Sequence, residues 1–100
     1  MQNKFRWTSK ALQDLVSIKV YIEQDNPKAA VDLTKKIVLK VVEQLTKFQN
    51  IGKAGRVHGT RELVISNTPY IAVYRVKSGS VEVLRVLHTS IKWPDNVDGL

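Results

Sequence analysis

The spacing of apolar residues changes once along this chain, and the change restricts the folds that the chain can adopt. Between residues 11 and 45, apolar side chains recur at every third or fourth position, as on one face of a helix. From residue 63 to 88 they alternate with polar residues or run together, as they do in strands. Helices grouped before strands are typical of an α+β domain, in which the helices pack on one face of a sheet.

Asn26-Pro27 divides the helical half into two helices. An asparagine side chain accepts hydrogen bonds from the free amides of a first turn, and a proline at the first helical position has no amide to lose. We expect a first helix, capped by Thr8 or Ser9, to end near Gln24, and a second helix to follow in an antiparallel hairpin. The residues expected to face the core are Ala11, Leu15, Ile18 and Ile22, widened by Leu12 and Val16, and then Ala30, Leu33, Ile37, Val41 and Leu45, with Phe48 anchoring the exit.

The other half predicts a meander of strands. Strands are expected at 62–65, 70–76 and 81–88, joined by turns at 66–69 and 77–80, after a glycine-containing loop at 49–60. The last strand is almost continuously apolar, which favours a central position. With a short strand at 4–7, the predicted fold is α+β: an N-terminal strand and an antiparallel helical hairpin packed on a small antiparallel sheet that ends in a three-strand meander. Residues 1–94 are expected to form one domain, and 95–100 a loose C-terminal tail.

The composition favours an anionic partner. Lysine and arginine number 16 against 9 acidic residues, a formal charge of +7. Such an excess favours nucleic acid, ribosomes or an acidic protein segment, while the alternative is a basic domain with no specific polyanion. The absence of cysteine excludes disulfides and thiolate chemistry. Because no apolar run has the length of a membrane span and the N-terminus lacks a signal-peptide pattern, we predict a cytoplasmic protein.

No motif predicts a metal, a cofactor or a hydrolytic site. Neither histidine has a ligand at metal-binding spacing, and no serine hydrolase or phosphate-loop motif occurs. We therefore predict no metal and no cofactor. Since carboxylates are mostly exposed, those of Asp14, Glu23, Glu62 and Glu82 are interpreted as surface charges.

Basic residues give the more informative pattern. Arg56, His58 and Arg61 lie in RVHGTREL, at the entrance to a strand, and their donors can bind carboxylates or phosphates. Arg75 and Arg85 lie within strands, where an arginine must be paired or at an edge. Two alternatives remain open for these two: ion pairs with Glu62 or Glu82 across the sheet, or a concave basic surface.

Strand alternation and aromatic residues supply two further expectations. Alternation predicts that Arg85 and His88 point to opposite faces of the sheet, while Arg75 shares a face with Ile71 and Val73. The aromatic rings of Trp7, Tyr70 and Trp93 could stack on bases. Burial in the core is favoured for them, with Trp93-Pro94 folding back as a lid.

Four blocks in register carry a resemblance to a known family: WTSKALQDLVSIKVYIEQDNPKAA, GTRELVI, PYIAVYRV and VEVLRVLHTSIKWP. Together they resemble the RelE/ParE superfamily of bacterial toxins over nearly the whole chain. The resemblance implies a helical hairpin over a small antiparallel sheet. It also implies a type II toxin–antitoxin (plasmid stabilisation) module, in which a cognate antitoxin wraps and neutralises the toxin.

The superfamily divides between gyrase inhibitors and ribosome-dependent mRNA endonucleases. RelE-like nucleases are metal-independent and carry an arginine after the tyrosine of the second meander strand, where this chain has Ile71 after Tyr70. They also carry lysines in the preceding strand, where this chain has Glu62-Leu63-Val64. The resemblance therefore favours a ParE-like, non-enzymatic inhibitor of DNA gyrase that blocks replication. The alternatives are a RelE-like nuclease that stops translation and an inactive binding relative.

The site residues differ between these alternatives. The basic and exposed positions expected to bind an antitoxin or a target are Arg56, His58, Arg61, Arg75, Arg85, His88, Lys92 and Trp93. No catalytic residue is assigned for a gyrase inhibitor. For an mRNA endonuclease the catalytic set would be Arg56, Arg61, Arg85 and His88, because His88 lies close to where some ribosome-dependent relatives place a catalytic histidine.

Overall fold

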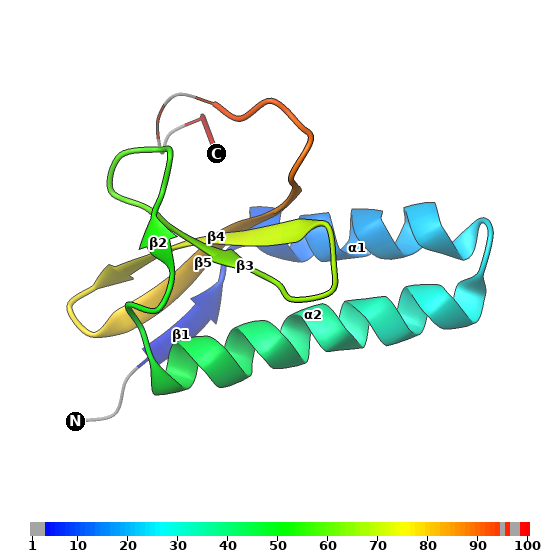
Figure 1. Ribbon diagram of the computed structural model, residues 1–100, viewed down its shortest axis with the longest axis horizontal. Coiled ribbons are helices and arrows are strands. Elements are labelled where there is room, and N and C mark those ends of the chain that lie inside the picture. The colour runs from blue at the N-terminus through cyan, green and yellow to red at the C-terminus, as the bar shows by residue number, and fades with distance from the viewer. Residues whose placement is uncertain (1–3, 95, 97–98) are drawn as a thin grey trace.

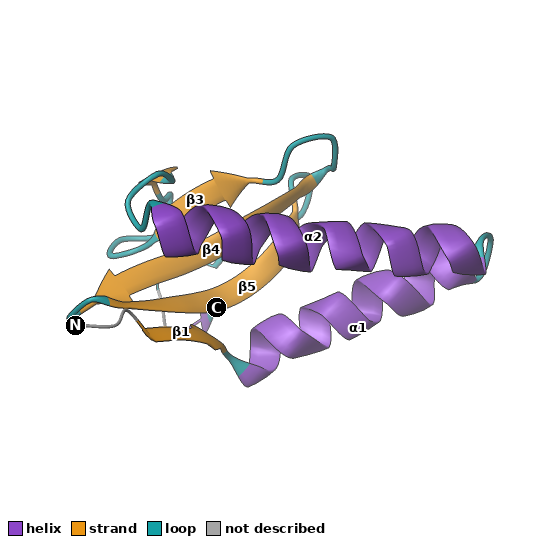
Figure 2. Ribbon diagram, turned by 90° about the horizontal axis from the view of Figure 1, so that it is seen from below, coloured by secondary structure: helices purple, strands orange, loops and turns teal. Residues whose placement is uncertain are grey.

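The fold is the α+β arrangement predicted above. A computed structural model describes residues 4–94, 96 and 99–100. Its elements are β1 (Lys4–Trp7), α1 (Ser9–Glu23), α2 (Pro27–Lys47), β2 (Lys53–Ala54), β3 (Arg61–Val64), β4 (Tyr70–Lys77) and β5 (Ser80–His88). The two helices form a hairpin along one face of the sheet, and the C-terminal segment crosses the other (Figures 1 and 2).

Both helices begin at the predicted caps. The Thr8 hydroxyl accepts a hydrogen bond from the amide of Ala11 at 3.1 Å, and the Asn26 side chain accepts one from the amide of Ala29 at 3.0 Å. Pro27 occupies the first position of α2. Each side-chain oxygen satisfies an amide that has no partner inside its helix. The short link between α1 and α2 therefore produces the predicted antiparallel hairpin.

The predicted apolar stripes are confirmed in their centres and wrong at their margins. Of the nine residues expected to form the stripes, seven are buried and two, Ile22 and Leu33, pack against the core at partial exposure. Leu12 and Val16, expected to widen the first stripe, are 50% and 62% exposed. Each lies one residue, or about 100° around the helix, from a buried position. Phe48, expected to anchor the exit, is also 62% exposed.

The sheet is mixed and has five strands, in the order β1-β5-β4-β3-β2. The meander β3-β4-β5 is antiparallel, and β5 is an interior strand between β1 and β4, which agrees with the predicted central position. β1, however, pairs parallel to β5, which corrects the expectation of a wholly antiparallel sheet. β2 lies in the segment predicted as a loop and pairs with β3. Its two residues are too few to give an alternating pattern.

Apolar side chains form two clusters, one on each face of the sheet. The first core lies under the helices and includes Ile37, Val41, Tyr74 and Val83. The second core lies on the other face and consists of Val57, Ile71, Val73, Leu84, Leu87, Trp93 and Leu100. Trp93 is buried there, which confirms that it folds back over the sheet, and Tyr70 is buried in the first core.

The last residue of the chain also belongs to the second core. Leu100 is 4% exposed, and its backbone oxygen accepts a hydrogen bond from the Lys10 ammonium. This contact differs from the loose tail expected at 95–100. Residues 95, 97 and 98 of that tail lie outside the described residues.

Candidate functional site

Arg56, Glu62 and Trp93 form one cluster where the loop at residues 55–60 meets β3. The Glu62 carboxylate accepts hydrogen bonds from the backbone amide of Arg56 at 2.7 Å and from its Nε and Nη2 at 3.2 and 3.3 Å. The Arg56 guanidinium carbon lies 3.6 Å from the centroid of a Trp93 ring, a cation–π contact. The Glu62 side chain is 1% exposed and that of Arg56 is 45% exposed. The carboxylate is therefore compensated inside the protein, while part of the guanidinium faces solvent.

Local hydrogen bonds hold the loop that presents Arg56. Thr60 donates through both its amide and its hydroxyl to the carbonyl of Val57, at 3.1 and 2.6 Å. Gly59 has φ +83°, a conformation that side-chain-bearing residues rarely adopt. The buried Val57 anchors the loop in the second core. This turn directs the Arg56 amide at Glu62 and leaves His58 exposed at the tip.

Arg61 closes the segment before β2 instead of projecting into a shared basic surface. Its Nη1 donates to the carbonyls of Gly52 at 2.8 Å and Asn50 at 3.3 Å. The Tyr74 hydroxyl lies beside it, donating to the carbonyl of Gln49 at 2.8 Å and accepting from the amide of Gly52 at 2.9 Å. The same segment is thus fixed to the sheet from two sides.

The two strand arginines are both paired, one with a carboxylate considered from the sequence and one with a carboxylate that was not. Arg75 donates from Nε and Nη2 to Glu82 at 2.8 and 2.7 Å, which confirms the cross-strand pair and its face of the sheet. Arg85 binds Asp14 of α1 through two parallel contacts at 2.7 and 2.8 Å. Its partner is therefore on a helix and not on the sheet. The two arginines do not form one concave surface.

The hydrogen bond with Asp14 raises the pKa of Arg85, with desolvation opposing it. Asp14 also accepts from the amide of Val86 at 2.9 Å. The one carboxylate therefore ties α1 to β5 at three donors. Arg85 therefore has a structural role, since its ion pair with Asp14 holds α1 against β5.

The strand register confirms the prediction that Arg85 and His88 belong to opposite faces of the sheet. A register shift between Val73 and Tyr74 of β4 places an extra residue in β5 before Arg85, and residues 85–88 pair regularly after it. Arg85 lies opposite Val73 of the second core, whereas His88 lies opposite Tyr70 of the first core. The His88 ring packs edge-on against Tyr70, with centroids 5.4 Å apart, and the Arg85 side chain extends to Asp14 of α1.

His88 is partly exposed and bonded to the segment that follows it. Its Nδ1 lies 3.1 Å from the Ser90 amide, which donates to it, and 2.8 Å from the Ser90 hydroxyl. Lys92 is exposed nearby in sequence, while Trp93 is buried beneath Arg56. The four residues expected to form an endonuclease site therefore bind different partners. Arg56 and Arg61 lie on either side of the loop and bind Glu62 and the carbonyl of Gly52. Arg85 binds Asp14, and His88 contacts Ser90.

The carboxylates are the residues that sequence reasoning misjudged. Glu62 is buried, and the side chains of Glu82 and Asp14 are only 16% and 14% exposed. All three were interpreted as surface charges, but each is the acceptor for an arginine. Arg6 was not singled out, yet it also pairs with Glu82. These ion pairs could have been anticipated from the sequence, because an arginine within a strand requires a partner when it is not at an edge.

Two further properties of the described residues limit the chemistry. Within residues 4–94, 96 and 99–100, no three His, Asp or Glu side chains are grouped to hold a metal ion. No helix in this part of the chain has the length and apolar character needed to cross a membrane.

Burial raises the pKa of Tyr74, and its hydrogen bond with Gly52 and the charge of Arg61 oppose this rise. Burial likewise raises the pKa of Tyr70.

Comparison with known proteins agrees with this architecture. Residues 5–93 match the family described as the ParE toxin of the type II toxin-antitoxin system, parDE. The chain is 41% identical over 93 residues to Y4kP of Sinorhizobium fredii, covering 93% of this chain and 95% of that protein. It is 33% identical over 86 residues to toxin RelE2 of Caulobacter vibrioides, covering 84% and 92%.

Two solved structures share the fold. A chain from the chromosomal ParDE system of P. aeruginosa superposes with a TM-score of 0.78 at 30% identity, over 87% of this chain and 96% of that one. A chain from the RelBE2 toxin-antitoxin complex of Mycobacterium tuberculosis gives a TM-score of 0.57 at 22% identity, over 88% and 99%. The second likeness concerns the fold alone.

Proposed function

Because this chain belongs to the ParE toxin family of type II toxin–antitoxin systems, we propose that it arrests growth by inhibiting DNA gyrase, without catalysing a reaction itself. The observation that carries the proposal is the dispersal of the basic residues. Arg85 is bound to Asp14 of α1, and Arg56 is bound to Glu62 of β3. An endonuclease needs its cations to converge on one phosphate, preorganised for the transition state.

Ile71 supports the same proposal. This residue stands where the RelE-like nuclease pattern has an arginine, and it is 4% exposed within the second core. An apolar side chain there belongs to the same buried cluster as Val73 and Trp93 and offers no hydrogen-bond donor to a phosphate. The side chain at this position therefore contributes to the stability of the fold.

In the resting state we propose a cognate antitoxin as the partner. The ParDE and RelBE2 systems named above are toxin–antitoxin systems, and the fold of this chain is theirs. The contact residues proposed for an acidic antitoxin segment or for the target are the exposed His58 and Lys92 and the half-exposed guanidinium of Arg56. A guanidinium with free N–H groups can still donate to a second carboxylate or to a phosphate.

The test is a supercoiling assay. Purified chain is added to DNA gyrase, relaxed plasmid and ATP, and the gel is read for lost supercoiling and trapped linear or nicked DNA. We expect both, and we expect them to disappear when the toxin is first mixed with its antitoxin. Full gyrase activity at an excess of folded chain would contradict the proposal.

An mRNA endonuclease is the second candidate, favoured by the 33% identity to toxin RelE2 and by the partly exposed His88. A ribosome-dependent cleavage assay separates it from the first. In that case Arg85→Ala and His88→Ala would lower the cleavage rate. If induced expression does not slow growth at all, the chain is a binding relative without toxicity.

A further inference from the structure

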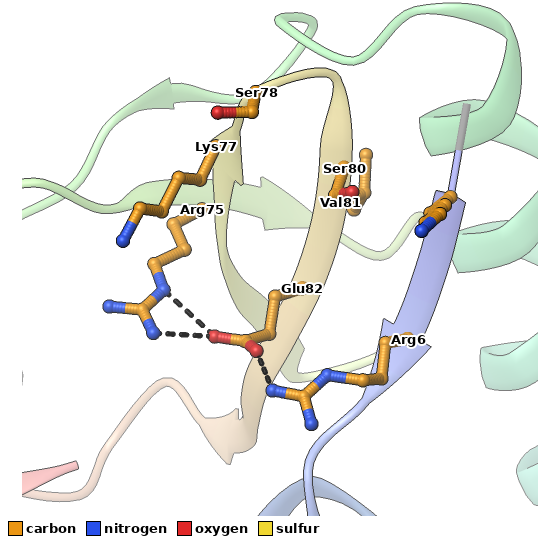
Figure 3. Close-up of a pocket in the computed structure, with 8 residues that line it drawn as sticks. Arg6, Arg75, Lys77, Ser78, Ser80, Val81 and Glu82 are labelled. Atoms are coloured by element: carbon orange, nitrogen blue, oxygen red, sulfur yellow. Dashed lines mark hydrogen bonds and ion pairs between the residues drawn. The ribbon is translucent and has the colours of Figure 1, made fainter. Parts of the chain in front are cut away.

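A basic pocket lies at the end of the sheet, near the turn between β4 and β5. It has a volume of about 480 Å³, and its lining includes Lys4, Arg6, Arg75, Lys77, Ser80 and Glu82. In Figure 3 the Glu82 carboxylate lies between the guanidinium groups of Arg6 and Arg75. Four cations and one carboxylate give these residues a formal charge of +3.

Strand register explains why these side chains share a surface. β1, β5 and β4 are neighbours, and Arg6, Glu82 and Arg75 are directly opposite one another across them. Two residues along, Lys4, Ser80 and Lys77 form a second row. Residues two apart in a strand point to the same face, so the rows lie about 6.6 Å apart on one face.

Glu82 orients the arginines without consuming their donors. Arg75 uses Nε and Nη2 on one carboxylate oxygen, and Arg6 uses Nη2 on the other. A guanidinium has five N–H donors, so each arginine retains donors for a ligand. The hairpin turn adds the hydroxyl of Ser78, which has φ +52°. Within the part of the chain that the structure describes, Lys4 and Lys77 form no ion pair, and both are exposed.

We propose that this pocket binds the phosphate groups of a nucleotide or polynucleotide. A planar carboxylate can be satisfied by one guanidinium, whereas a tetrahedral phosphate accepts from donors in several directions, as three strands supply here. The volume is in the range of sites for ligands of nucleotide size, which is larger than a single acidic side chain requires. The pocket is separate from the Arg56–Glu62–Trp93 cluster and independent of whether gyrase or the ribosome is the target.

The test compares two variants of equal charge. Lys4→Ala/Lys77→Ala removes the two unpaired cations of the pocket, and Lys35→Ala/Lys40→Ala removes two lysines from the outer side of α2. Binding of a labelled single-stranded DNA is followed by fluorescence anisotropy as a function of salt. Circular dichroism melting establishes that both variants are folded.

We expect the slope of log K against log salt to fall by about 1.4 for the pocket variant, since each phosphate contact to a single strand contributes about 0.7. Between about 50 and 200 mM salt, the native affinity should then fall about sevenfold more than that of the pocket variant. The control variant should keep the native slope. An equal change in both variants would overturn the proposal, because it would report net charge alone.

Competitors identify the source of the phosphate. ATP or inorganic pyrophosphate could displace the DNA from the native chain and leave the weaker complex of DNA with the pocket variant intact. In that case the pocket binds free phosphate compounds as well as DNA. If only oligonucleotides displace it, the ligand is a polynucleotide. If polyglutamate displaces the DNA and the phosphate compounds do not, the pocket is a site for an acidic peptide and the proposal is wrong.

Discussion

The two faces of the sheet are covered in different ways. The first core is closed by two long helices whose apolar residues recur at regular spacing. The second core is closed by single residues from irregular segments: Val57 from a loop, and Trp93 and Leu100 from the C-terminal segment. The helices cover their face with apolar side chains that recur at helical spacing. The irregular segments are instead held in place by hydrogen bonds to single polar side chains, such as those of Glu62 and Lys10.

The difference indicates where each face is vulnerable. Removing a buried methyl group from a packed helix leaves a cavity that its neighbours fill only in part. Removing an anchor from an irregular segment releases the segment, which then regains conformational entropy and offsets part of the loss. We therefore expect larger losses of stability under the helices than on the opposite face.

Ile37→Ala should have the largest effect. The side chain is completely buried in the first core, and Ile→Ala changes at such positions cost about 3 kcal/mol of unfolding free energy. Urea denaturation should show a lower midpoint with an unchanged slope. Leu39→Ala, on the same helix at 66% exposure, is the matched control and should stay within about 0.5 kcal/mol of the native chain.

The same contrast explains how far the sequence predicted the fold. Periodicity located Ala11 to Leu45 and the meander, because regular elements repeat their side-chain environment and so leave a pattern. The loop that helps to close the second core left none, because Val57 lies in a segment without period. The burial of Trp93 was predicted, but its contact with Arg56 joins residues distant in sequence. The burial of Glu62 depends on these long-range contacts, so its carboxylate was mistaken for a surface charge.

The candidate site was predictable in its residue types and not in its arrangement. The sequence identified the arginines and offered Glu82 as one of two possible partners for Arg75. It did not identify Asp14 as the partner of Arg85, because that contact joins a helix to a strand 71 residues away. The register shift in β5 is likewise invisible to an argument from alternation.

Glu62→Gln tests the polar support of the second core. The amide keeps the shape of the side chain but loses the charge that binds Arg56, and we expect a loss of about 2 kcal/mol, moderated by the exposure of the guanidinium. In a Trp7→Phe background, the emission of Trp93 should shift to longer wavelength as the loop loosens. Glu43→Gln on the exposed side of α2 is the control. A native midpoint for Glu62→Gln would show that the buried charge contributes nothing.

Tyr74→Phe tests the contact between the first core and the segment before β2. Its hydroxyl satisfies both the Gly52 amide and the Gln49 carbonyl, so its removal should cost about 1.5 kcal/mol. Burial raises the pKa of Tyr74 above its ordinary value of 10.0, so above that pH the unfolded chain ionises first. The native chain should therefore lose stability as pH rises beyond 10.

The phenylalanine variant should lose stability less steeply over that range. The loss should not vanish, because burial also raises the pKa of Tyr70. Unfolding free energies measured between about pH 8 and 11 give the two slopes. Parallel curves for the native and Tyr74→Phe chains would exclude Tyr74 as a source of the alkaline loss.

Leu100→Ala should have the smallest effect on global stability and the most local one. The side chain is buried, yet it belongs to the irregular segment after β5, which regains conformational freedom when released, so we expect a loss of about 1 kcal/mol. Acrylamide quenching of Trp93 fluorescence is measured again in a Trp7→Phe background. It should increase by more than the population of globally unfolded protein accounts for, because the second core can open while the first stays closed. A loss equal to that of Ile37→Ala would mean that both faces unfold as one unit. Unchanged stability and quenching would mean that Leu100 is not held in the second core in solution. Either result would show that the contrast between the helix-covered face and the irregularly covered face does not extend to the contact of Leu100 with the second core.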